Sequence, residues 1–435
     1  MARVVVVGGG LGGTAAAARL AKLGHRVTLV EQQDRLGGAV GYVEQDGFRW
    51  DSGPTSTALP AVVRDLFRKS GRPLERELEL VPLEPMREHR FPDGAALSLP
   101  SGSRSAQLEA IDAALGAGLG RQWVDYTHSF ADTWDRLRRG YLERPYSPDH
   151  VDRAVRDLLS SRATLHKVVG KAFKDQRLRQ VALHQVVLDG HDPRNVPAWV
   201  GMLSYIEQNF GAWTVPGGMG ALAGLLTKRL GERKVEVLLE TRARDIVHRD
   251  GRPVAVETDD GPVDADVVVC AVDPRGIPLL APHVARTMPA LPPVVVHLGL
   301  VGEVPALPPE LVLHGDQTIV VRTNGSAPPG AHAWTLLGRG GRLSEDLVAV
   351  LARELVNVRD LVEVRVDRTP RELVETWGGS PYGVLWQGRG TVTQKLGTRS
   401  PYAGVYCAGA SVAATSGLPF TGLTAAVVAE QVGPA

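Results

Sequence analysis

Residues 2–31 read ARVVVVGGGLGGTAAAARLAKLGHRVTLVE, and this stretch decides the fold. The β-branched run 2–7 predicts a buried parallel strand, because strands covered on both faces are continuously apolar. The alanine-rich segment 14–23 predicts a helix that ends near Gly24, and 25–30 predicts a second strand. The stretch therefore predicts a strand–helix–strand unit, the building block of an α/β protein with a parallel sheet.

Glycines fill the turn between the first strand and the helix. Gly8, Gly10 and Gly13 match the pattern GxGxxG, and Glu31 follows Gly13 by 18 residues. Gly8 allows a tight turn, Gly10 lets the backbone approach a pyrophosphate, and Gly13 lets helix and strand pack closely. The helix N-terminus supplies unpaired N–H groups for the phosphates. Because Glu31 would bind a ribose and repel a 2′-phosphate, we expect FAD or NAD and not NADP.

More glycines follow this unit closely. A second pair, Gly37-Gly38, comes six residues after Glu31 and would bring more backbone to the far half of the cofactor. Residues 47–55 read GFRWDSGPT, which predicts a strand that ends in a tight turn. Taken alone, these could be ordinary loop glycines, so their order along the chain carries the interpretation.

Together these residues resemble the phytoene desaturase branch of the amine-oxidase-like flavoproteins. In that family GxGxxG, an acid ending the second strand, a GG pair and a GF-x-x-D-x-GPT segment follow one another in this order. The segments HQVVLDGHDP at 184–193, VPGGMGAL at 215–222 and GVYCAGA at 404–410 are also similar to the family, as is the turn 417–422.

This resemblance implies an α/β fold with a Rossmann-like FAD-binding domain of the GR2 type, a discontinuous α+β substrate domain and a helical cap. Residues 1–85, 211–285 and 386–435 would form the FAD-binding domain. Residues 86–210 would form the helical cap and the first part of the substrate domain, and 286–385 its second part.

The resemblance also implies FAD as the cofactor and a set of residues that contact it. Ala243 would meet the adenine, and the 417–422 turn would lie beneath the flavin ring. The expected cofactor-binding residues are Gly8, Gly10, Leu11, Gly12, Gly13, Glu31, Gln32, Gly37, Gly38, Gly53, Pro54, Thr55, Ala243, Gly409, Ala410, Leu418, Pro419 and Gly422. The chain departs from the family at Ala39, where a basic residue is usual, and at 411–416, where small residues replace a His-Pro pair.

In the rest of the chain, the spacing of apolar residues predicts the helices and strands. Residues 104–180 have helical spacing and predict the cap. Residues 291–300 and 308–322 predict strands of the substrate domain, and 344–356 predicts a helix with Ser344 as its N-cap.

In such a fold the reacting group is the flavin N5, and the protein binds, orients and excludes water. His184, Tyr205 and Trp213 are weak candidates for catalysis, each with core packing as the stronger interpretation. The remaining histidines show no ligand spacing, so no metal site is expected.

We therefore expect an FAD-dependent oxidoreductase that desaturates or saturates C–C bonds of a hydrophobic biosynthetic intermediate, such as a carotenoid, another isoprenoid or a polyketide-like molecule. A flavin amine or amino-acid oxidase is one alternative, and it would need a carboxylate-binding arginine and an aromatic pair at the flavin; Arg322 and Trp377 are its candidates. A non-redox polyene isomerase and a flavin-retaining protein without catalysis are the others.

Composition limits the other function classes. The 49 Lys+Arg and 48 Asp+Glu leave a formal net charge of +1, which argues against a nucleic-acid partner. The 2 cysteines, Cys270 and Cys407, cannot form a disulfide framework. With no signal peptide and no apolar run near the ~20 residues of a membrane span, we expect a cytoplasmic protein. The arginine stretches 136–139 and 177–179 indicate solvated helix faces, with peripheral membrane contact as the alternative.

Overall fold

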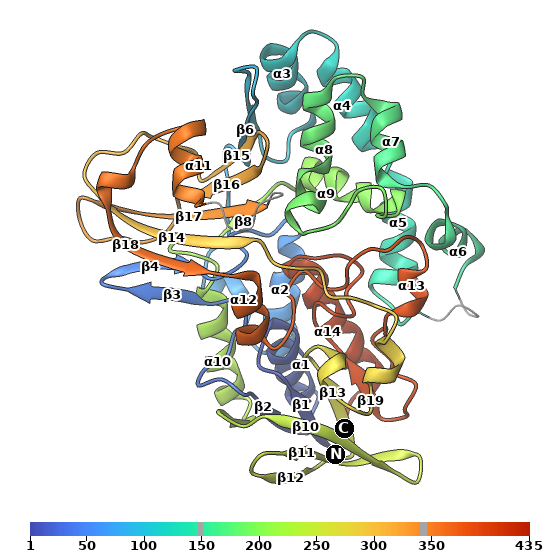
Figure 1. Ribbon diagram of the computed structural model, residues 1–435. Helices are drawn as coiled ribbons and strands as arrows, with labels where there is room; N and C mark the ends of the chain where they lie inside the picture. Colours follow the sequence, from blue (N-terminus) through green and yellow to red (C-terminus); the bar gives the residue numbers. More distant parts are fainter. Residues whose placement is uncertain (147–150, 340–345) are drawn as a thin grey trace.

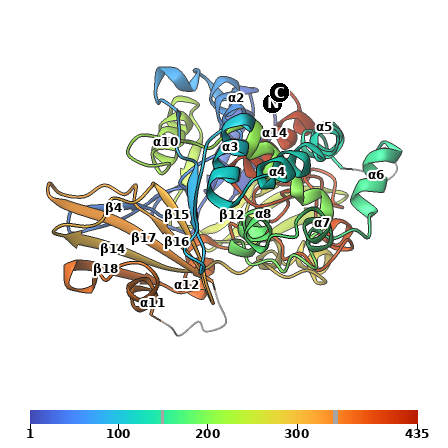
Figure 2. The same cartoon turned by 90° about the horizontal axis from the view of Figure 1, so that it is seen from above.

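The computed structural model describes residues 1–146, 151–339 and 346–435. Figure 1 shows a parallel sheet with its helices at one end of the molecule and a group of helices at the other. A larger sheet lies beside them. Seen from above, that larger sheet is next to the helical group (Figure 2).

The first of these units is a five-stranded parallel sheet in the order β19-β13-β1-β2-β9. Its strands are β1 (Arg3–Val7), β2 (Arg26–Val30), β9 (Glu236–Leu238), β13 (Val267–Cys270) and β19 (Val405–Cys407). Helix α1 (Leu11–Lys22) connects β1 to β2, as the glycine-rich stretch predicts. The sheet thus draws on separated parts of the chain, and the α/β fold with a Rossmann-like unit is confirmed.

Helix α1 is surrounded by other helices. Residues 11–20 are all buried, and the four alanines 15–18 are fully inaccessible. Their small side chains let α14 (Leu418–Val432), α10 (Ala221–Glu232) and α2 (Pro60–Ser70) pack close to the α1 backbone. Because residues 11–20 are buried on every side, α1 is a core helix whose N-terminus has a fixed position.

Smaller sheets extend this unit. Strands β10 (Ala243–Arg249), β11 (Arg252–Thr258) and β12 (Gly261–Asp264) form an antiparallel meander at the end of the molecule (Figure 1). The other short strands are β3 (Tyr42–Gln45) with β4 (Phe48–Asp51), and β5 (Val81–Pro82) with β8 (Trp213–Thr214).

The larger sheet has seven strands in the order β18-β14-β17-β16-β15-β6-β7. Its strands are β6 (Arg87–Arg90), β7 (Ala96–Leu99), β14 (Val294–Val301), β15 (Glu310–His314), β16 (Thr318–Arg322), β17 (Ala331–Arg339) and β18 (Val362–Arg368). It joins two parts of the chain, because β6 pairs in parallel with β15. The strands expected over 291–300 and 308–322 are present, the latter as the β15–β16 hairpin.

Two helices accompany this sheet: α11 (Leu347–Glu354) and α12 (Pro370–Trp377). The N-cap of α11 is Asp346, whose side chain accepts a hydrogen bond from the Val348 N–H at 3.0 Å. The prediction of Ser344 as the N-cap was therefore wrong, and Ser344 itself lies outside the described residues. Thr369 and Glu372 form a capping box at the start of α12.

The helical cap lies between β7 and β8 in sequence. Its helices are α3 (Arg104–Leu115), α4 (Leu119–His128), α5 (Ala131–Leu137), α6 (Arg153–Ser160), α7 (Leu165–Ala172), α8 (Gln176–Leu188) and α9 (Met202–Phe210). Their apolar faces build one core around Trp123, Phe173 and Trp199. The helical cap expected over 104–180 is therefore present. A further short helix, α13 (Thr391–Gln394), lies between α12 and β19 in sequence.

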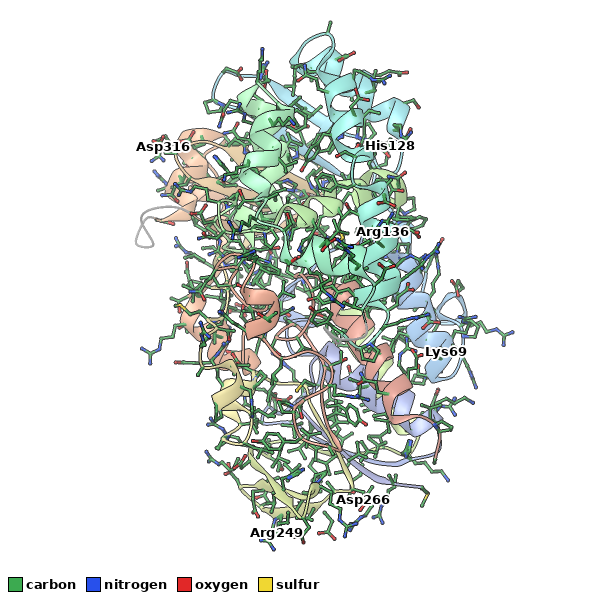
Figure 3. The ribbon with its side chains drawn as sticks, turned by 90° about the vertical axis from the view of Figure 1, so that its right-hand side faces the viewer. Lys69, His128, Arg136, Arg249, Asp266 and Asp316 are labelled. Carbon is green, nitrogen blue, oxygen red and sulfur yellow. The ribbon has the colours of Figure 1, made fainter. Side chains whose placement is uncertain are left out.

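The arginine-rich stretches lie on the outside of the cap and are largely paired with acids. Arg136 lies among the cap helices (Figure 3), where its side chain is 45% exposed and contacts Asp132 at 2.6 Å. Arg177 bonds Asp175 at 2.7 Å. Among the described residues, no helix is both long and apolar enough to cross a membrane.

Candidate functional site

The first glycine loop joins β1 to α1, and its geometry requires glycine. Gly8 has a φ of +103°, and a Cβ on Gly13 would lie 1.8 Å from the Gly8 carbonyl oxygen. A Cβ on Gly10, the N-cap of α1, would meet nothing within 4 Å. Gly8 and Gly13 therefore serve the turn and the helix–strand contact, whereas Gly10 faces open space at the helix N-terminus.

The second glycine pair packs directly on the first loop. The Gly37 N–H donates to the Gly9 carbonyl at 2.8 Å, and Gly10 and Gly37 form an isolated parallel bridge. A Cβ on Gly38 would lie 3.1 Å from the Gly10 Cα. The two glycine segments thus form one continuous backbone surface.

A third backbone segment closes on the same point from the C-terminal end of the chain. A Cβ on Gly12 would lie 2.6 Å from the Gly409 Cα. The Gly409 N–H donates to Thr424 Oγ1 at 2.9 Å, which ties this loop to α14. Gly417, with a φ of +107°, directly precedes α14 and places that helix N-terminus beside the loops.

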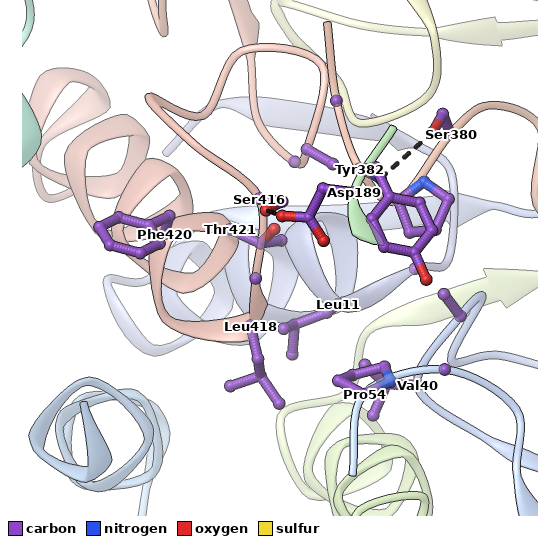
Figure 4. Close-up of a pocket in the computed structure, with 18 of the residues that line it drawn as sticks. Leu11, Val40, Pro54, Asp189, Ser380, Tyr382, Ser416, Leu418, Phe420 and Thr421 are labelled. Atoms are coloured by element: carbon purple, nitrogen blue, oxygen red, sulfur yellow. Dashed lines mark hydrogen bonds between the residues drawn. The ribbon is translucent and has the colours of Figure 1, made fainter. Parts of the chain in front are cut away.

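These loops open into a large cavity. Its volume is about 1710 Å³ when the solvent-filled space at its opening is included. Figure 4 shows Leu11, Val40 and Pro54 on one side of it and Asp189, Ser416 and Tyr382 on the other. From the glycine loops the cavity continues to the cap helices α8 and α9 and to the seven-stranded sheet. One space therefore connects the dinucleotide-type loops to both the cap and the larger sheet.

Four charged side chains line the far part of the cavity as one network. Arg87 on β6 donates two hydrogen bonds to Glu207 on α9, at 2.8 and 2.9 Å, and one to Glu310 on β15, at 3.1 Å. Arg322 on β16 donates to Glu310 at 3.0 Å and to the Gly53 carbonyl at 3.0 Å. The guanidinium groups lower the pKa of Glu310 to about 2 and lower that of Glu207, against the opposing effect of burial. The network fastens the cap to the sheet.

Asp189, the C-cap of α8, is buried in the cavity wall. Its carboxylate accepts hydrogen bonds from Gln185 Nε2 at 3.0 Å and from the Ser416 hydroxyl. Burial raises the pKa of the Asp189 carboxyl to about 6. Burial likewise raises the pKa of the neighbouring Tyr382 hydroxyl to about 12.

The comparisons with known proteins agree with this geometry. Residues 11–428 match the family described as flavin containing amine oxidoreductase. The chain belongs to this family. Among its relatives, the 4,4′-diapolycopene oxygenase of Methylomonas sp. is 30% identical over 280 residues, which cover 61% of this chain and 55% of that protein. The phytoene dehydrogenase of Streptomyces griseus is 33% identical over 279 residues, 62% of this chain and 54% of that protein.

The solved structure of cyclohexylamine oxidase from Brevibacterium oxydans IH-35A has the same fold, with a TM-score of 0.67 and 17% identity over 99% of each chain. The predicted resemblance to the phytoene desaturase branch is confirmed by the relatives. The chain spans about half the length of the curated relatives it matches.

The cofactor of this flavoprotein is FAD, and its residues fit that group. Gly10 leaves open space at the N-terminus of α1, where a pyrophosphate would meet backbone N–H groups. The Glu31 carboxylate lies at the tip of the loop, where it accepts from the Gly9 N–H at 2.6 Å and the Gln33 N–H at 2.8 Å. The assignment of individual cofactor contacts stays a prediction.

Most of the predicted cofactor residues line the cavity: Gly10, Leu11, Gly12, Gly37, Gly38, Gly53, Pro54, Thr55, Gly409, Ala410, Leu418 and Pro419. Gly8 and Gly13 lie behind them in the turn. Gly422 faces α2, where a Cβ would lie 3.0 Å from Val62, and it lines a small apolar pocket instead.

The predicted adenosine end lies beyond this cavity, around Glu31. The Thr241 N–H donates to the Glu31 carbonyl at 2.9 Å, so Ala243, two residues further on, begins β10 beside that strand end. Gln32 reaches toward Gly378, where a Cβ would lie 3.3 Å from its Nε2.

The three catalytic candidates do not line the cavity of the flavoprotein. His184 lies in a separate small pocket under the cap, with Nδ1 2.7 Å from the Val181 carbonyl and its ring 5.0 Å from that of His89. Burial lowers the pKa of His184 to about 4. Tyr205 packs against the cap core, and Trp213 donates its Nε1–H to the Phe210 carbonyl at 2.7 Å. Core packing, the stronger interpretation from sequence, fits all three positions.

Apart from Arg322 and Trp377, sequence reasoning did not select the side chains that line the cavity beyond the glycine loops. Asp189 stood within the family-like segment 184–193, where the acid at the helix end was the available signal. Ser416 stood in the turn 411–416, whose small residues were noted as a departure. Arg322 and Trp377, named for the amine oxidase alternative, do line the cavity.

Proposed function

We propose that this flavoprotein is an FAD-dependent dehydrogenase that introduces C=C double bonds into an acyclic isoprenoid of the carotenoid class. The observation that carries the proposal is the continuity of the cavity from the glycine loops to the cap. The named relatives, a diapolycopene oxygenase and a phytoene dehydrogenase, supply the substrate class.

The lining of the cavity supports an apolar ligand. Leu188, Leu203, Ile206, Trp377 and Phe420 contribute apolar side chains to it. Each methylene of an isoprenoid chain that they remove from water would stabilise the complex by about 0.8 kcal/mol. Most charged groups of the lining are already bonded to one another, so they would not require a charged substrate.

When bound, FAD supplies the hydride acceptor at N5. The glycine loops and the N-terminus of α1 would bind its pyrophosphate through backbone N–H groups. The N-terminus of α14, after Gly417, would place a partial positive charge beside the ring system. The cap residues Leu203 and Ile206 would cover the substrate and exclude water from the reacting carbons.

The amine oxidase alternative is less well supported. Arg322 lines the cavity, but its guanidinium already bonds Glu310 and the Gly53 carbonyl. A substrate carboxylate would have to displace those partners, which lie at 3.0 Å each.

The test begins with the visible spectrum of the purified protein. A flavin absorption pair is expected, and a colourless protein that gains no FAD on reconstitution would exclude the cofactor. Anaerobic mixing with an acyclic C40 polyene of the phytoene type in detergent micelles should then bleach the flavin and yield a product two hydrogens poorer by mass spectrometry. Bleaching by a primary amine but not by the polyene would contradict the proposed substrate class.

A further inference from the structure

Asp189 differs from the other carboxylates of the cavity in its partners. Glu207 and Glu310 pair with Arg87, and Asp273 pairs with Arg275 at 2.9 Å. Within the described ranges 1–146, 151–339 and 346–435, Asp189 forms no ion pair. Its hydrogen-bond donors are the neutral groups of Gln185 and Ser416, so its charge is not neutralised by direct contact.

Asp189 lies where the part of the cavity lined by the glycine loops meets the part lined by the cap. It ends α8 of the cap, and through Ser416 it contacts the turn that leads into α14. Figure 4 shows its carboxylate facing the cavity between Ser416 and Tyr382, opposite Leu11 and Pro54. A carboxylate at this point faces the glycine-loop side of the cavity, beneath the cap.

The surroundings of Asp189 suit a group that gains and loses a proton. The residue is 2% exposed, which shields it from bulk water. Its pKa of about 6 leaves it mainly ionised at neutral pH yet more basic than an ordinary aspartate. Arg339 and Arg322 act on it as longer-range charges that favour the ionised form, and the Asp189 charge in turn contributes to the raised pKa of Tyr382. The Ser416 hydroxyl can rotate to serve either protonation state.

We propose that Asp189 is the proton acceptor of the dehydrogenation, a role that rests on the proposed function. One C–H bond of the substrate breaks and its electron pair leaves as hydride to the oxidised flavin. The C–H bond on the adjacent carbon gives its electron pair to the new C=C bond and its proton to a carboxylate oxygen of Asp189. The products are the alkene, the two-electron-reduced flavin and the neutral Asp189 carboxylic acid.

The test compares D189N and D189E with D192N. Asp192 is a matched control three positions later in the chain: its side chain is 39% exposed, pairs with Arg194 and does not line the cavity. The rate of anaerobic flavin reduction by the phytoene-type polyene is measured against pH. In the wild type it should fall about tenfold per pH unit below pH 6. D189N should be slower by about a hundredfold or more and show no such dependence. D189E should recover part of the rate, and D192N should match the wild type.

A second measurement needs no turnover. Infrared difference spectra of the FAD-loaded protein without substrate should show a carboxyl band that grows as the pH falls through about 6. The band should be missing in D189N and present in D192N. This measurement and D189E keep the test decisive even if D189N loses FAD.

The outcomes separate the two proposals. A wild type that holds FAD but is not reduced by the polyene overturns the proposed function. A wild type that is reduced, with D189N as fast or altered in KM alone, overturns the role of Asp189 and leaves the function standing. Absence of the infrared band in the wild type also overturns the role of Asp189.

Discussion

Replacement of Arg87 by methionine removes the cation that joins the cap to the seven-stranded sheet. The Arg87 side chain is 5% exposed, and those of its partners Glu207 and Glu310 are 21% and 15% exposed. The substitution keeps much of the aliphatic volume but deletes three charge-assisted hydrogen bonds. Glu310 would retain Arg322, whereas Glu207 would lose the cation with which it pairs in the described structure.

The expected loss of stability in R87M comes from the Glu207 carboxylate, which stays buried without its cation. Removing one partner of a buried ion pair typically costs about 3–5 kcal/mol, because the other charge stays desolvated without compensation. R87M should therefore lower the free energy of unfolding by about that amount at neutral pH. Adding E207Q removes the stranded charge and should restore a large part of it, giving a coupling energy on the order of 2 kcal/mol.

The pH dependence of this loss has a definite sign. The pKa values of Glu207 and Glu310 are lowered from an ordinary value of 4.5, that of Glu310 to about 2. Their stabilising contribution is thus complete above pH 4.5 and is lost as the pH falls toward the folded-state pKa. The difference between wild type and R87M should shrink over that acid window.

The free energies of unfolding of wild type, R87M, E207Q and the double variant are measured in urea. Together they form a double-mutant cycle that gives the coupling energy between Arg87 and Glu207. R121M is the control, because it breaks an exposed pair with Asp125 whose side chains are 73% and 58% exposed. That control should cost no more than about 0.5 kcal/mol. An R87M variant as stable as R121M, or a cycle with no coupling, would refute the reasoning.

Three further predictions follow from the same geometry. E31A should raise the Kd for FAD about tenfold or more in a fluorescence titration, since hydrogen bonds to a charged group contribute about 1.5–3 kcal/mol; an unchanged Kd would show that Glu31 does not hold the adenosine end. G12A would place a Cβ 2.6 Å from the Gly409 Cα and should lower the FAD content of the purified protein, whereas G224A, whose Cβ has open space, should keep FAD and gain about 0.5–1 kcal/mol in helix α10. D189N should raise the free energy of unfolding at pH 7 by about 2–3 kcal/mol, because the pKa rises from 3.8 to about 6 on folding and each pKa unit corresponds to about 1.4 kcal/mol. That gain should shrink as the pH falls below about 6 and vanish well below pH 3.8, where the carboxyl is neutral in both states; a D189N no more stable than wild type at pH 7 would contradict it.

Local patterns in the sequence were enough to predict the first unit of the fold. The valine run, the alanine-rich helix and the second strand are each specified by neighbours in sequence, and β1, α1 and β2 lie where they were expected. The structural roles of Gly8 and Gly13 were also predictable, since they answer local demands: the positive φ of Gly8 and the close approach of Gly13 to the Gly8 carbonyl. Long-range contacts then brought Gly37 and Gly409 onto that same loop.

The far part of the cavity could not be predicted in this way. Arg87 and Glu310 are 223 positions apart in the chain, and Asp189 and Ser416 are 227 apart. The first pair is set by the pairing of β6 with β15, and the second by the packing of α8 on the turn before α14. One sequence does not reveal such long-range packing through periodicity. His184 was a candidate because of its imidazole, but its ring faces His89 of β6 beneath the cap, whereas Asp189 five residues later lines the cavity.

An apolar substrate can bind in a cavity with charged lining residues because most of these residues form ion pairs with one another. Arg87 donates hydrogen bonds to two carboxylates, and Arg322 donates to Glu310 and to a backbone carbonyl. An ammonium substrate would need a carboxylate without a direct cation partner, and among the described lining residues Asp189 has that property. The same group therefore decides between the two substrate classes: with an isoprenoid it accepts a proton from carbon, and with an amine it would hold a charge. Loss of rate with a flattened pH profile in D189N indicates the first, and loss of affinity alone indicates the second.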